Sequence, residues 1–318
     1  MFDVITFGSA TWDIFIRDKK ISFKKDQRIF NQKGVFLPLG SKIDLDEIHF
    51  SSGGGATNTA ACFSSLGLKT ACCSLVGSDL SGRQIIDDLK KFKVETKLIL
   101  ENKRKPTNHS IIISLPERDR TILAYRGASE DLSVIPWSQI KAKWLYLAPF
   151  SGQAENCLEK IVEFAFKNGI KVAVNPSKNQ LKKIKKILNK IDVLILNQEE
   201  ASLLTNIPYH KEKLIFEKAS SLCSGILVMT KGKRGAMVSL GKERYQVGII
   251  KEKVVDRTGA GDSFGSAFVS ALIMNKSIEE SLQLASANAT SCLQFWGAKN
   301  GLLKKNQKYD KIKVNKYA

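Results

Sequence analysis

Short apolar runs alternate with segments whose apolar residues recur every three or four positions in the second half of the chain. The runs at 144–147, 172–175, 193–196, 226–230 and 236–239 predict buried strands, and the periodic segments at 154–168, 180–188, 199–204 and 211–223 predict helices. Strands that alternate with helices of this length are typical of a mostly parallel sheet. We therefore expect such a sheet, covered by helices on both faces.

The first half of the chain has a less regular pattern. Residues 2–7 predict a buried first strand, followed later by a helix at 56–66, a strand at 69–76 and a helix at 82–91. Short apolar and polar pieces with Gly and Pro breaks predict β-hairpins between 14 and 50, and two strands flank the turn at 116–119, at 110–115 and 121–125. We expect one core with an inserted β lid, the core spanning 1–13, 48–106 and 127–318 and the lid 14–47 and 107–126.

Candidate chemistry is concentrated where a turn of small residues enters a helix. Apolar residues at helical spacing follow Gly261, so Asp262 falls in the first turn of that helix. The amides of Gly259, Ala260 and Gly261 then lack partners and form an anion site, beside which Asp262 can accept a proton from a hydroxyl. A turn needed only for packing is the alternative. The segment matches neither the dinucleotide fingerprint nor a P-loop.

Three other polar motifs occupy turns or strand ends. Gly53 and Gly54 precede a helix that carries Asn58, so backbone and amide can approach a polyhydroxylated ligand, although a flexible turn explains the glycines equally well. Asn197 and Glu200 follow a strand, where α/β sheets bind ligands, or else form a capping box. Residues 230–235 follow the next strand and predict either a phosphate contact or a hairpin turn.

Composition narrows the function classes. The 318 residues carry a formal net charge of +19, but the lysines gather at 182–190 and 304–316, and no aromatics are interleaved among the first group. This pattern is typical of solvated faces, so we do not expect nucleic-acid binding. No leader segment or long apolar stretch occurs, which predicts a cytoplasmic protein without a membrane partner. The six cysteines lack zinc or disulfide spacing and are expected to be reduced and mostly buried.

Taken in order, the motifs resemble those of the ribokinase/pfkB carbohydrate kinase family. They are Gly-Gly-x-x-x-Asn at 53–58, Asn-x-x-Glu at 197–200, Thr-x-Gly-x-x-Gly at 230–235 and Asp-x-Thr-Gly-Ala-Gly-Asp at 256–262. Each motif alone is weak, but the ordered set is specific, and the resemblance extends over residues 2–301. It implies a ribokinase-like three-layer α/β/α core with a β-sheet lid, and ATP-dependent phosphorylation of a hydroxymethyl group.

The resemblance also implies roles for individual residues. Asp262 would be the catalytic base, with the amides of Gly259, Ala260 and Gly261 stabilising the transferred phosphoryl group. The expected sugar contacts are Asp13, Gly53, Gly54 and Asn58, and the expected nucleotide contacts are Asn197, Glu200, Thr230, Gly232 and Asn288. Glu200 would bind Mg²⁺ through water, and Asp256 occupies the place where many members hold a monovalent cation, which makes K⁺ a candidate activator.

Departures from the family pattern leave the acceptor open. Thr11 replaces an Asn found in ribokinases, Ala148 lies where they offer a Glu to ribose, and Arg257 takes a place often held by Thr. Trp12 is either a stacking surface that favours a nucleoside or a larger sugar over free ribose, or an ordinary core residue of the lid. We therefore expect a sugar kinase, with a nucleoside kinase as the alternative. A nucleic-acid-binding protein is the alternative from another class, and pairing of two lids predicts a homodimer.

Overall fold

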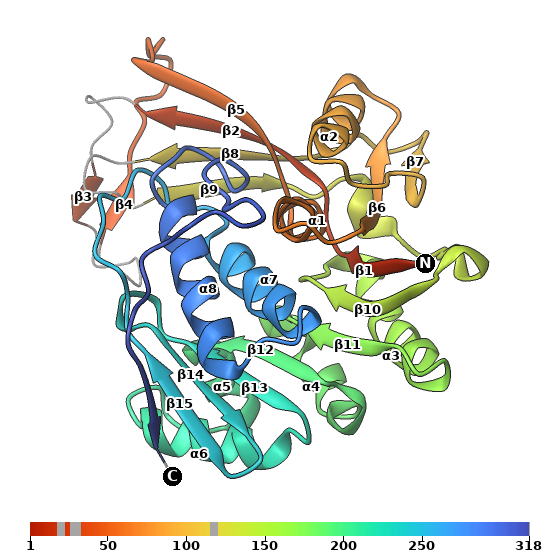
Figure 1. The fold of residues 1–318 in the computed structure, drawn as a ribbon. Coiled ribbons are helices and arrows are strands. Elements are labelled where there is room, and N and C mark those ends of the chain that lie inside the picture. The colour runs from red at the N-terminus through yellow and green to blue at the C-terminus, as the bar shows by residue number, and fades with distance from the viewer. Residues whose placement is uncertain (18–22, 26–32, 115–119, 318) are drawn as a thin grey trace.

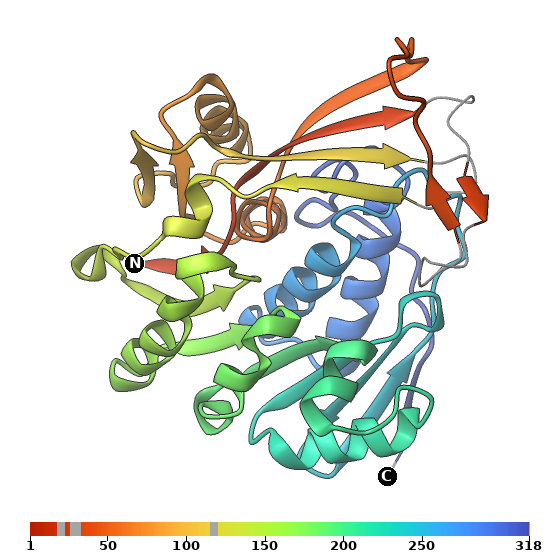
Figure 2. The same ribbon diagram turned by 180° about the vertical axis from the view of Figure 1, so that it is seen from behind.

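A ten-stranded sheet runs through the centre of the molecule (Figures 1 and 2), in a computed structural model that describes residues 1–17, 23–25, 33–114 and 120–317. In order across the sheet, its strands are β16 (Val314–Tyr317), β15 (Glu243–Val247), β14 (Ala236–Leu240), β13 (Ile226–Thr230), β12 (Val193–Asn197), β11 (Lys171–Val174), β10 (Ala142–Leu147), β1 (Phe2–Phe7), β6 (Thr70–Gly77) and β7 (Ile99–Asn102). Neighbours from β7 to β13 pair in parallel, and those from β13 to β16 are antiparallel. The expected mostly parallel sheet is confirmed.

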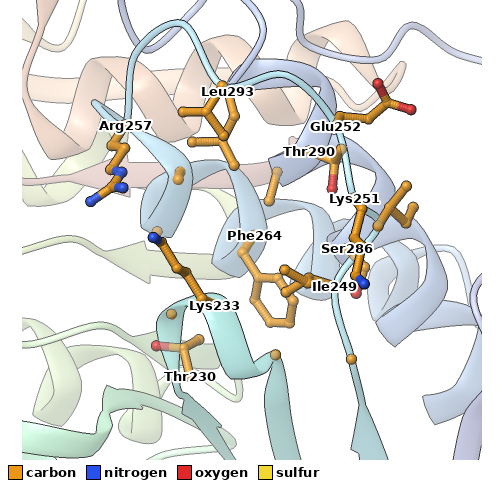
Figure 3. Close-up of a pocket in the computed structure, with 18 residues that line it drawn as sticks. Thr230, Lys233, Ile249, Lys251, Glu252, Arg257, Phe264, Ser286, Thr290 and Leu293 are labelled. Atoms are coloured by element: carbon orange, nitrogen blue, oxygen red, sulfur yellow. The ribbon is translucent and has the colours of Figure 1, made fainter. Parts of the chain in front are cut away.

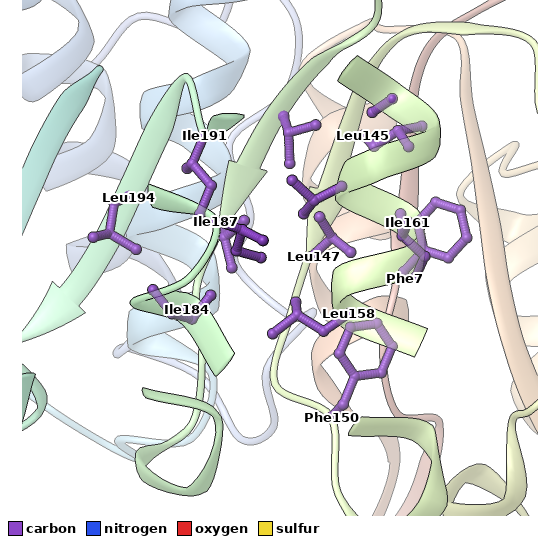
Figure 4. Close-up of a cluster of buried hydrophobic side chains, with 14 of the residues drawn as sticks. Phe7, Leu145, Leu147, Phe150, Leu158, Ile161, Ile184, Ile187, Ile191 and Leu194 are labelled. Atoms are coloured by element: carbon purple, nitrogen blue, oxygen red, sulfur yellow. The ribbon is translucent and has the colours of Figure 1, made fainter. Parts of the chain in front are cut away.

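Helices cover both faces of this sheet. The helices are α1 (Gly55–Ser65), α2 (Leu80–Lys91), α3 (Cys157–Lys167), α4 (Leu181–Ile184), α5 (Gln198–Thr205), α6 (Glu212–Leu222), α7 (Ala260–Ile273) and α8 (Ile278–Cys292). Side chains of a strand alternate between faces, so Leu145 and Leu147 of β10 join the cluster with Leu158 and Ile161 of α3 (Figure 4), whereas Tyr146 packs on the face of α1, α7 and α8. The three-layer α/β/α core is confirmed.

Two expected helices differ in extent. The helix expected at 154–168 is preceded by a 3₁₀ turn over Gly152–Asn156 and begins as an α-helix at Cys157. The segment 180–188 is α-helical only over Leu181–Ile184 and is flanked by 3₁₀ turns. Lys182 lies three and four residues before Lys185 and Lys186, and like charges at these spacings destabilise a helix. The pattern did not predict β7, β15, α8 or β16.

A smaller sheet, which we call the lid sheet, projects from one end of the core (Figure 1). Its order is β5 (Glu47–Gly53), β2 (Thr11–Arg17), β8 (Asn108–Ser114) and β9 (Arg120–Tyr125); β2 and β8 are parallel and the other pairs antiparallel. Two short strands, β3 (Phe23–Lys25) and β4 (Lys33–Val35), pair separately. Strands β2 and β5 extend beyond the expected lid segment 14–47, so the exact domain boundaries stay a prediction. The turn at 116–119 lies outside the described residues.

The cysteines all have free thiols. Five are buried and Cys223 is half-buried, which confirms the expectation of reduced, mostly buried cysteines. Burial raises the pKa of the Cys62 and Cys72 thiols to about 12, because the thiolate loses its hydration. Among the described helices, none has the length and apolar character that a membrane crossing requires.

Candidate active site

Asp262 and Asn58 meet where the N-termini of α7 and α1 converge. The Asn58 amide Nδ2 donates a hydrogen bond of 2.8 Å to Asp262 Oδ2, while the buried Asn58 Oδ1 has no partner. Burial raises the pKa of Asp262, and the Asn58 hydrogen bond and the Lys299 charge act against that shift. A hydroxyl that donates to Asn58 Oδ1 would satisfy this orphaned acceptor and lie beside the Asp262 carboxylate.

Asp13 faces the same region from lid strand β2. Its side chain is buried, and burial raises its pKa to about 6 although the Ser110 hydroxyl and the Lys299 charge oppose the shift. Gly53 leaves the space that the carboxylate occupies, because a Cβ there would lie 1.9 Å from Asp13 Oδ2. Gly54 has φ +94°, and a Cβ there would lie 2.5 Å from the Ser9 carbonyl oxygen. At both positions a side chain would collide with neighbouring atoms, so close packing beside the site requires glycine.

The turn before α7 exposes backbone amides. Gly259, the N-cap residue, has φ +77°, and a Cβ there would lie 2.2 Å from the Ala298 Cβ, so only glycine fits. No side chain caps α7, and the first N–H groups of a helix have no partner within the helix. A Cβ on Gly261 would have no atom within 4 Å. The turn therefore offers hydrogen-bond donors to open space.

A cavity of about 530 Å³ adjoins this turn (Figure 3). Its walls come from the ends of β13 and β15, the loop before α7, and α7 and α8, and include Thr230, Gly232, Lys233, Gly235, Gly248, Ile249, Ile250, Lys251, Glu252, Val254, Arg257, Ala260, Gly261, Phe264, Ser286, Ala289, Thr290 and Leu293. The buried Ser286 Oγ has no hydrogen-bond partner. An apolar cavity with one unsatisfied hydroxyl and a cluster of amides at one end suits a flat ring joined to an anionic chain.

Three cations line the cavity, Lys233, Lys251 and Arg257, and none of them pairs with another described side chain. Lys233 lies on the loop after β13 and Arg257 just before α7, and both point toward the start of α7 in Figure 3. Neither takes part in any side-chain hydrogen bond or ion pair among the described residues. On the same loop, Lys231 and Arg234 are instead held by Glu212, at 2.8 and 2.5 Å. Glu212 thus fixes the loop and leaves Lys233 free for an anion in the cavity.

Asn197 and Glu200 form the capping box of α5. Asn197 Oδ1 accepts from the Glu200 N–H at 2.8 Å, and Glu200 Oε2 accepts from the Asn197 N–H at 2.8 Å. The fold therefore contains the capping box that was the alternative explanation of this motif. Burial raises the pKa of Glu200 to about 7. Its Oε1 has no hydrogen-bond partner among the described residues, so a carboxylate oxygen is available for a hard cation or its water.

Asn288 lies away from the cavity. Its side chain is fully buried, donating through Nδ2 to Ser263 O and Oγ and accepting through Oδ1 from the Leu303 N–H. The amide therefore joins α8 to α7 and to the segment after α8. The cavity is lined instead by other positions of α8, Ser286, Ala289 and Thr290.

Asp256 holds the loop before α7 in place. Its carboxylate accepts hydrogen bonds from the N–H and hydroxyl of Thr258, at 3.1 and 3.0 Å, and from the Gly297 N–H at 3.2 Å. Asp256 Oδ1 accepts both bonds from Thr258, whereas Oδ2 accepts only one from the described residues and retains a lone pair. In the described part of the chain, no three His, Cys, Asp or Glu side chains gather as metal ligands.

Three residues near the site were not predicted from the sequence. Ser286 lines the cavity, Lys299 is a buried lysine beside the lid sheet, and Trp296 contacts two lid strands. The Trp296 ring stacks on His49 with centroids 4.7 Å apart, and the Arg17 guanidinium lies 4.3 Å from its centroid. Trp296 and Lys299 lie more than 200 residues from their partners in the lid sheet, and Ser286 belongs to no motif. Local spacing along the chain therefore predicts none of the three.

Comparisons with known proteins agree with this arrangement. Residues 21–305 match the model of the pfkB family carbohydrate kinases. The chain is 28% identical over 274 residues to a ribokinase of Haemophilus influenzae, covering 84% of this chain and 89% of that protein. The structure of Arabidopsis thaliana ribokinase with ribose and ATP superimposes with a TM-score of 0.78 at 24% identity over 95% and 96% of the two chains. Adenosine kinase of Sinorhizobium meliloti has a TM-score of 0.75 at 22% identity, over 95% and 97%.

Proposed function

The chain belongs to the pfkB family of carbohydrate kinases, and on this basis we propose that it transfers the γ-phosphoryl group of ATP to a primary hydroxyl of a sugar. The observation that carries the proposal is the Asn58–Asp262 pair, in which an orphaned amide oxygen lies beside a carboxylate at the start of α7. This pair can bind a hydroxyl and take its proton at the entrance to an anion-binding turn.

In the proposed reaction, the acceptor hydroxyl donates its hydrogen bond to the Asp262 carboxylate and transfers that proton to it as the hydroxyl oxygen bonds to the phosphorus, while Asn58 Oδ1 accepts from a neighbouring hydroxyl of the sugar. The bond from the γ-phosphorus to the bridging oxygen of ADP breaks, and ADP leaves. The amides of Gly259, Ala260 and Gly261 stabilise the negative charge on the transferred group, because they already point to open space. Asp13 binds another hydroxyl of the sugar and so orients it.

The 530 Å³ cavity is the proposed nucleotide site. Apolar side chains such as Phe264 and Leu293 would cover the base, with Ser286 as a polar contact and Thr230 and Gly232 near the phosphates. Glu200 would hold Mg²⁺ through water, and the ion would supply positive charge to the phosphate oxygens. K⁺ activation through the remaining lone pair of Asp256 Oδ2 is part of the proposal. Asn288 supports the α7–α8 pair from the core.

A sugar is favoured over a nucleoside by the position of Trp12. Successive side chains of a strand point to opposite faces, so Trp12 faces away from the side of β2 that carries Asp13. Its ring packs against the cluster around Ile85 of α2, as expected for a core residue of the lid. The Trp12 ring therefore does not face the side of β2 on which Asp13 would bind the acceptor, and it is not placed to stack on a nucleoside base there.

The proposal is tested by measuring ADP release with the purified protein and ATP over a panel of ribose, fructose, 2-keto-3-deoxygluconate, adenosine, inosine and cytidine. We expect turnover with at least one sugar, and phosphorus NMR should identify a phosphomonoester product. Turnover with nucleosides alone would establish the alternative nucleoside kinase. Absence of turnover together with strongly salt-dependent RNA or DNA binding would contradict both.

Lys233 and Arg257 are expected to bind the phosphate chain of ATP. Exchange of either residue for Gln should raise the KM for ATP about three- to tenfold, because an exposed cation–phosphate contact contributes about 1 kcal/mol. Steady-state kinetics at fixed ionic strength measure the effect. Lys242→Gln, at the exposed turn between β14 and β15, is the matched control with no expected change. Equal KM values for all three variants would show that Lys233 and Arg257 do not bind ATP.

We also propose a homodimer through the outer face of the lid sheet. Phe50, Ile14, Ile111 and Leu123 form one row across its four strands, on the face opposite Asp13. Phe50 and Leu123 are 57% and 53% exposed. A contiguous apolar row of this kind is typical of an interaction surface, and an identical second copy is self-complementary to it.

Phe50→Asp should convert the dimer to a monomer, because pairing would bury the new carboxylates in an apolar interface. Light scattering at micromolar concentration should give twice 35.3 kDa for the wild type and 35.3 kDa for the variant. Phe166→Asp replaces a ring that is 60% exposed on α3, outside the lid sheet, and should leave the mass unchanged. A wild-type mass of one chain would contradict the proposal.

A further inference from the structure

Lys299 buries a positive charge beside the lid sheet. The residue is 4% exposed and lies on the segment after α8, where the core meets β5. Its Nζ donates hydrogen bonds to the Ser52 carbonyl oxygen at 2.6 Å and to Ser52 Oγ at 2.9 Å. A buried ammonium is unfavourable unless nearby groups compensate its charge, so the surroundings of this side chain need to be identified.

The compensating groups are carboxylates that do not touch the ammonium. No described carboxylate oxygen pairs with Lys299 Nζ within 4.0 Å, but Asp13 on β2, Asp88 on α2 and Asp262 on α7 all surround it at longer range, as does the Cys72 thiol on β6. Asp88 is also linked to it through Ser52, whose Oγ donates to Asp88 Oδ2 at 2.7 Å. Lys299 is therefore the cation shared by the two carboxylates of the proposed acceptor site.

Lys299 also fixes the backbone on which that site depends. Ser52 immediately precedes Gly53, the position at which a Cβ would lie 1.9 Å from Asp13 Oδ2. The chain then enters α1, whose buried Asn58 holds Asp262. The bonds from Lys299 to Ser52 therefore anchor the last residues of β5 between the Asp13 carboxylate and the helix that orients the base.

We propose that Lys299 is a positioning residue that anchors Ser52 beside Asp13 and supplies the positive charge that favours the ionised forms of Asp13 and Asp262. The proposal rests on the proposed kinase function of the same site. Burial lowers the pKa of Lys299 to about 8, while the carboxylates around it act to raise that pKa, so the ammonium is the prevailing form at neutral pH. Asp256 acts on Asp13 with the opposite sign, as a neighbouring negative charge.

The test uses Lys299→Gln, which can still donate to Ser52 but carries no charge, and Lys299→Arg, which keeps the charge. Without the cation, both carboxylates hold protons to higher pH, so kcat/KM for the acceptor should begin to fall at a pH about one unit higher than in the wild type. At a pH within this acidic fall, kcat/KM of Lys299→Gln should be about tenfold below the wild-type value. In Lys299→Arg, the acidic fall of kcat/KM should stay at its wild-type pH. The affinity for ATP should be unchanged, because Lys299 does not line the proposed nucleotide cavity.

Lys91→Gln is the matched control, because Lys91 pairs with Asp88 at 3.0 Å from the solvent side and its loss should leave the pH profile unchanged. Carboxyl carbon NMR of the free protein, assigned with Asp13→Asn and Asp262→Asn, follows the two titrations without turnover. If Lys299→Gln does not give a cooperative melt, Lys299→Met takes its place. An unshifted acidic fall of kcat/KM and unshifted titrations in the charge-free variant would overturn the proposal. Shifted titrations in a protein that phosphorylates no acceptor would contradict only the kinase function.

Discussion

Asp262→Asn is expected to lower kcat by about 10³-fold or more while the dissociation constant for ATP stays within about threefold of the wild-type value. The amide has nearly the shape of the carboxylate but cannot accept a proton from the acceptor hydroxyl. Its oxygen can still accept from Asn58 Nδ2, which lies 2.8 Å from Asp262 Oδ2 in the wild type. The chemical step is therefore lost and the local fold retained. Single-turnover kinetics and calorimetric ATP titration measure the two quantities separately.

The matched control is Asp87→Asn, which removes a carboxylate from the exposed face of α2, where it pairs with Lys90. This variant should keep wild-type kcat, since surface pairs of this kind contribute little. Asp262→Asn with more than about a tenth of wild-type kcat would show that another group accepts the proton. Equal loss in both variants would indicate a general charge effect and not a local base.

Gly259→Ala is expected to lose both stability and turnover. At φ +77° an alanine is strained by about 1–2 kcal/mol, and its Cβ would lie 2.2 Å from the Ala298 Cβ. The turn must shift, which costs about 3 kcal/mol in total and lowers Tm by roughly 6–10 °C. Displaced amides no longer face the phosphoryl group, so kcat should fall about 10²-fold. Differential scanning calorimetry and initial rates test the two effects.

Gly261→Ala separates stability from chemistry. Its backbone has no positive φ and a Cβ there meets no atom within 4 Å, so Tm should change little or rise, since Ala stabilises a helix relative to Gly by about 1 kcal/mol. The methyl group would nevertheless occupy the open space in front of the turn, and kcat should fall. Unchanged kcat in Gly261→Ala would place the transferred phosphoryl group elsewhere.

Much of the core was predictable because the sequence of each element has a recognisable pattern of apolar residues. Strands β10 to β13 are buried on both faces and therefore read as continuous apolar runs. The missed α8 does have a local signal, since the N-cap Ser277 and Glu280 in the first turn form a capping box. Strands β15 and β16 lie at the antiparallel edge of the sheet, where mixed polar sequences such as Val314–Tyr317 carry no clear period.

The candidate site was predictable only where a motif is contiguous. Asp262 and Gly259 belong to one turn, and the structure places them at the start of one helix as that spacing predicts. The roles of the predicted site residues remain predictions, and the variants above test those of Asp262, Gly259 and Gly261. Lys299 could not be inferred, because its contact with Ser52 spans 247 positions and depends on how β5 meets the segment after α8. Asn288 is expected at the nucleotide from the family resemblance, but a motif position does not show which way its side chain points from α8, and its amide bonds to Ser263 and Leu303.

The buried thiols make the protein well suited to site-specific dye labelling. Maleimides react with the thiolate, and burial raises the pKa of all six cysteines, so the native chain should be nearly inert to them. A cysteine introduced at Leu39, a fully exposed lid position, would then carry the only dye. With Trp12, Trp137 and Trp144 replaced by Phe, energy transfer from Trp296, which touches β2 and β5, would report how the lid moves relative to the core during turnover without removing any native cysteine.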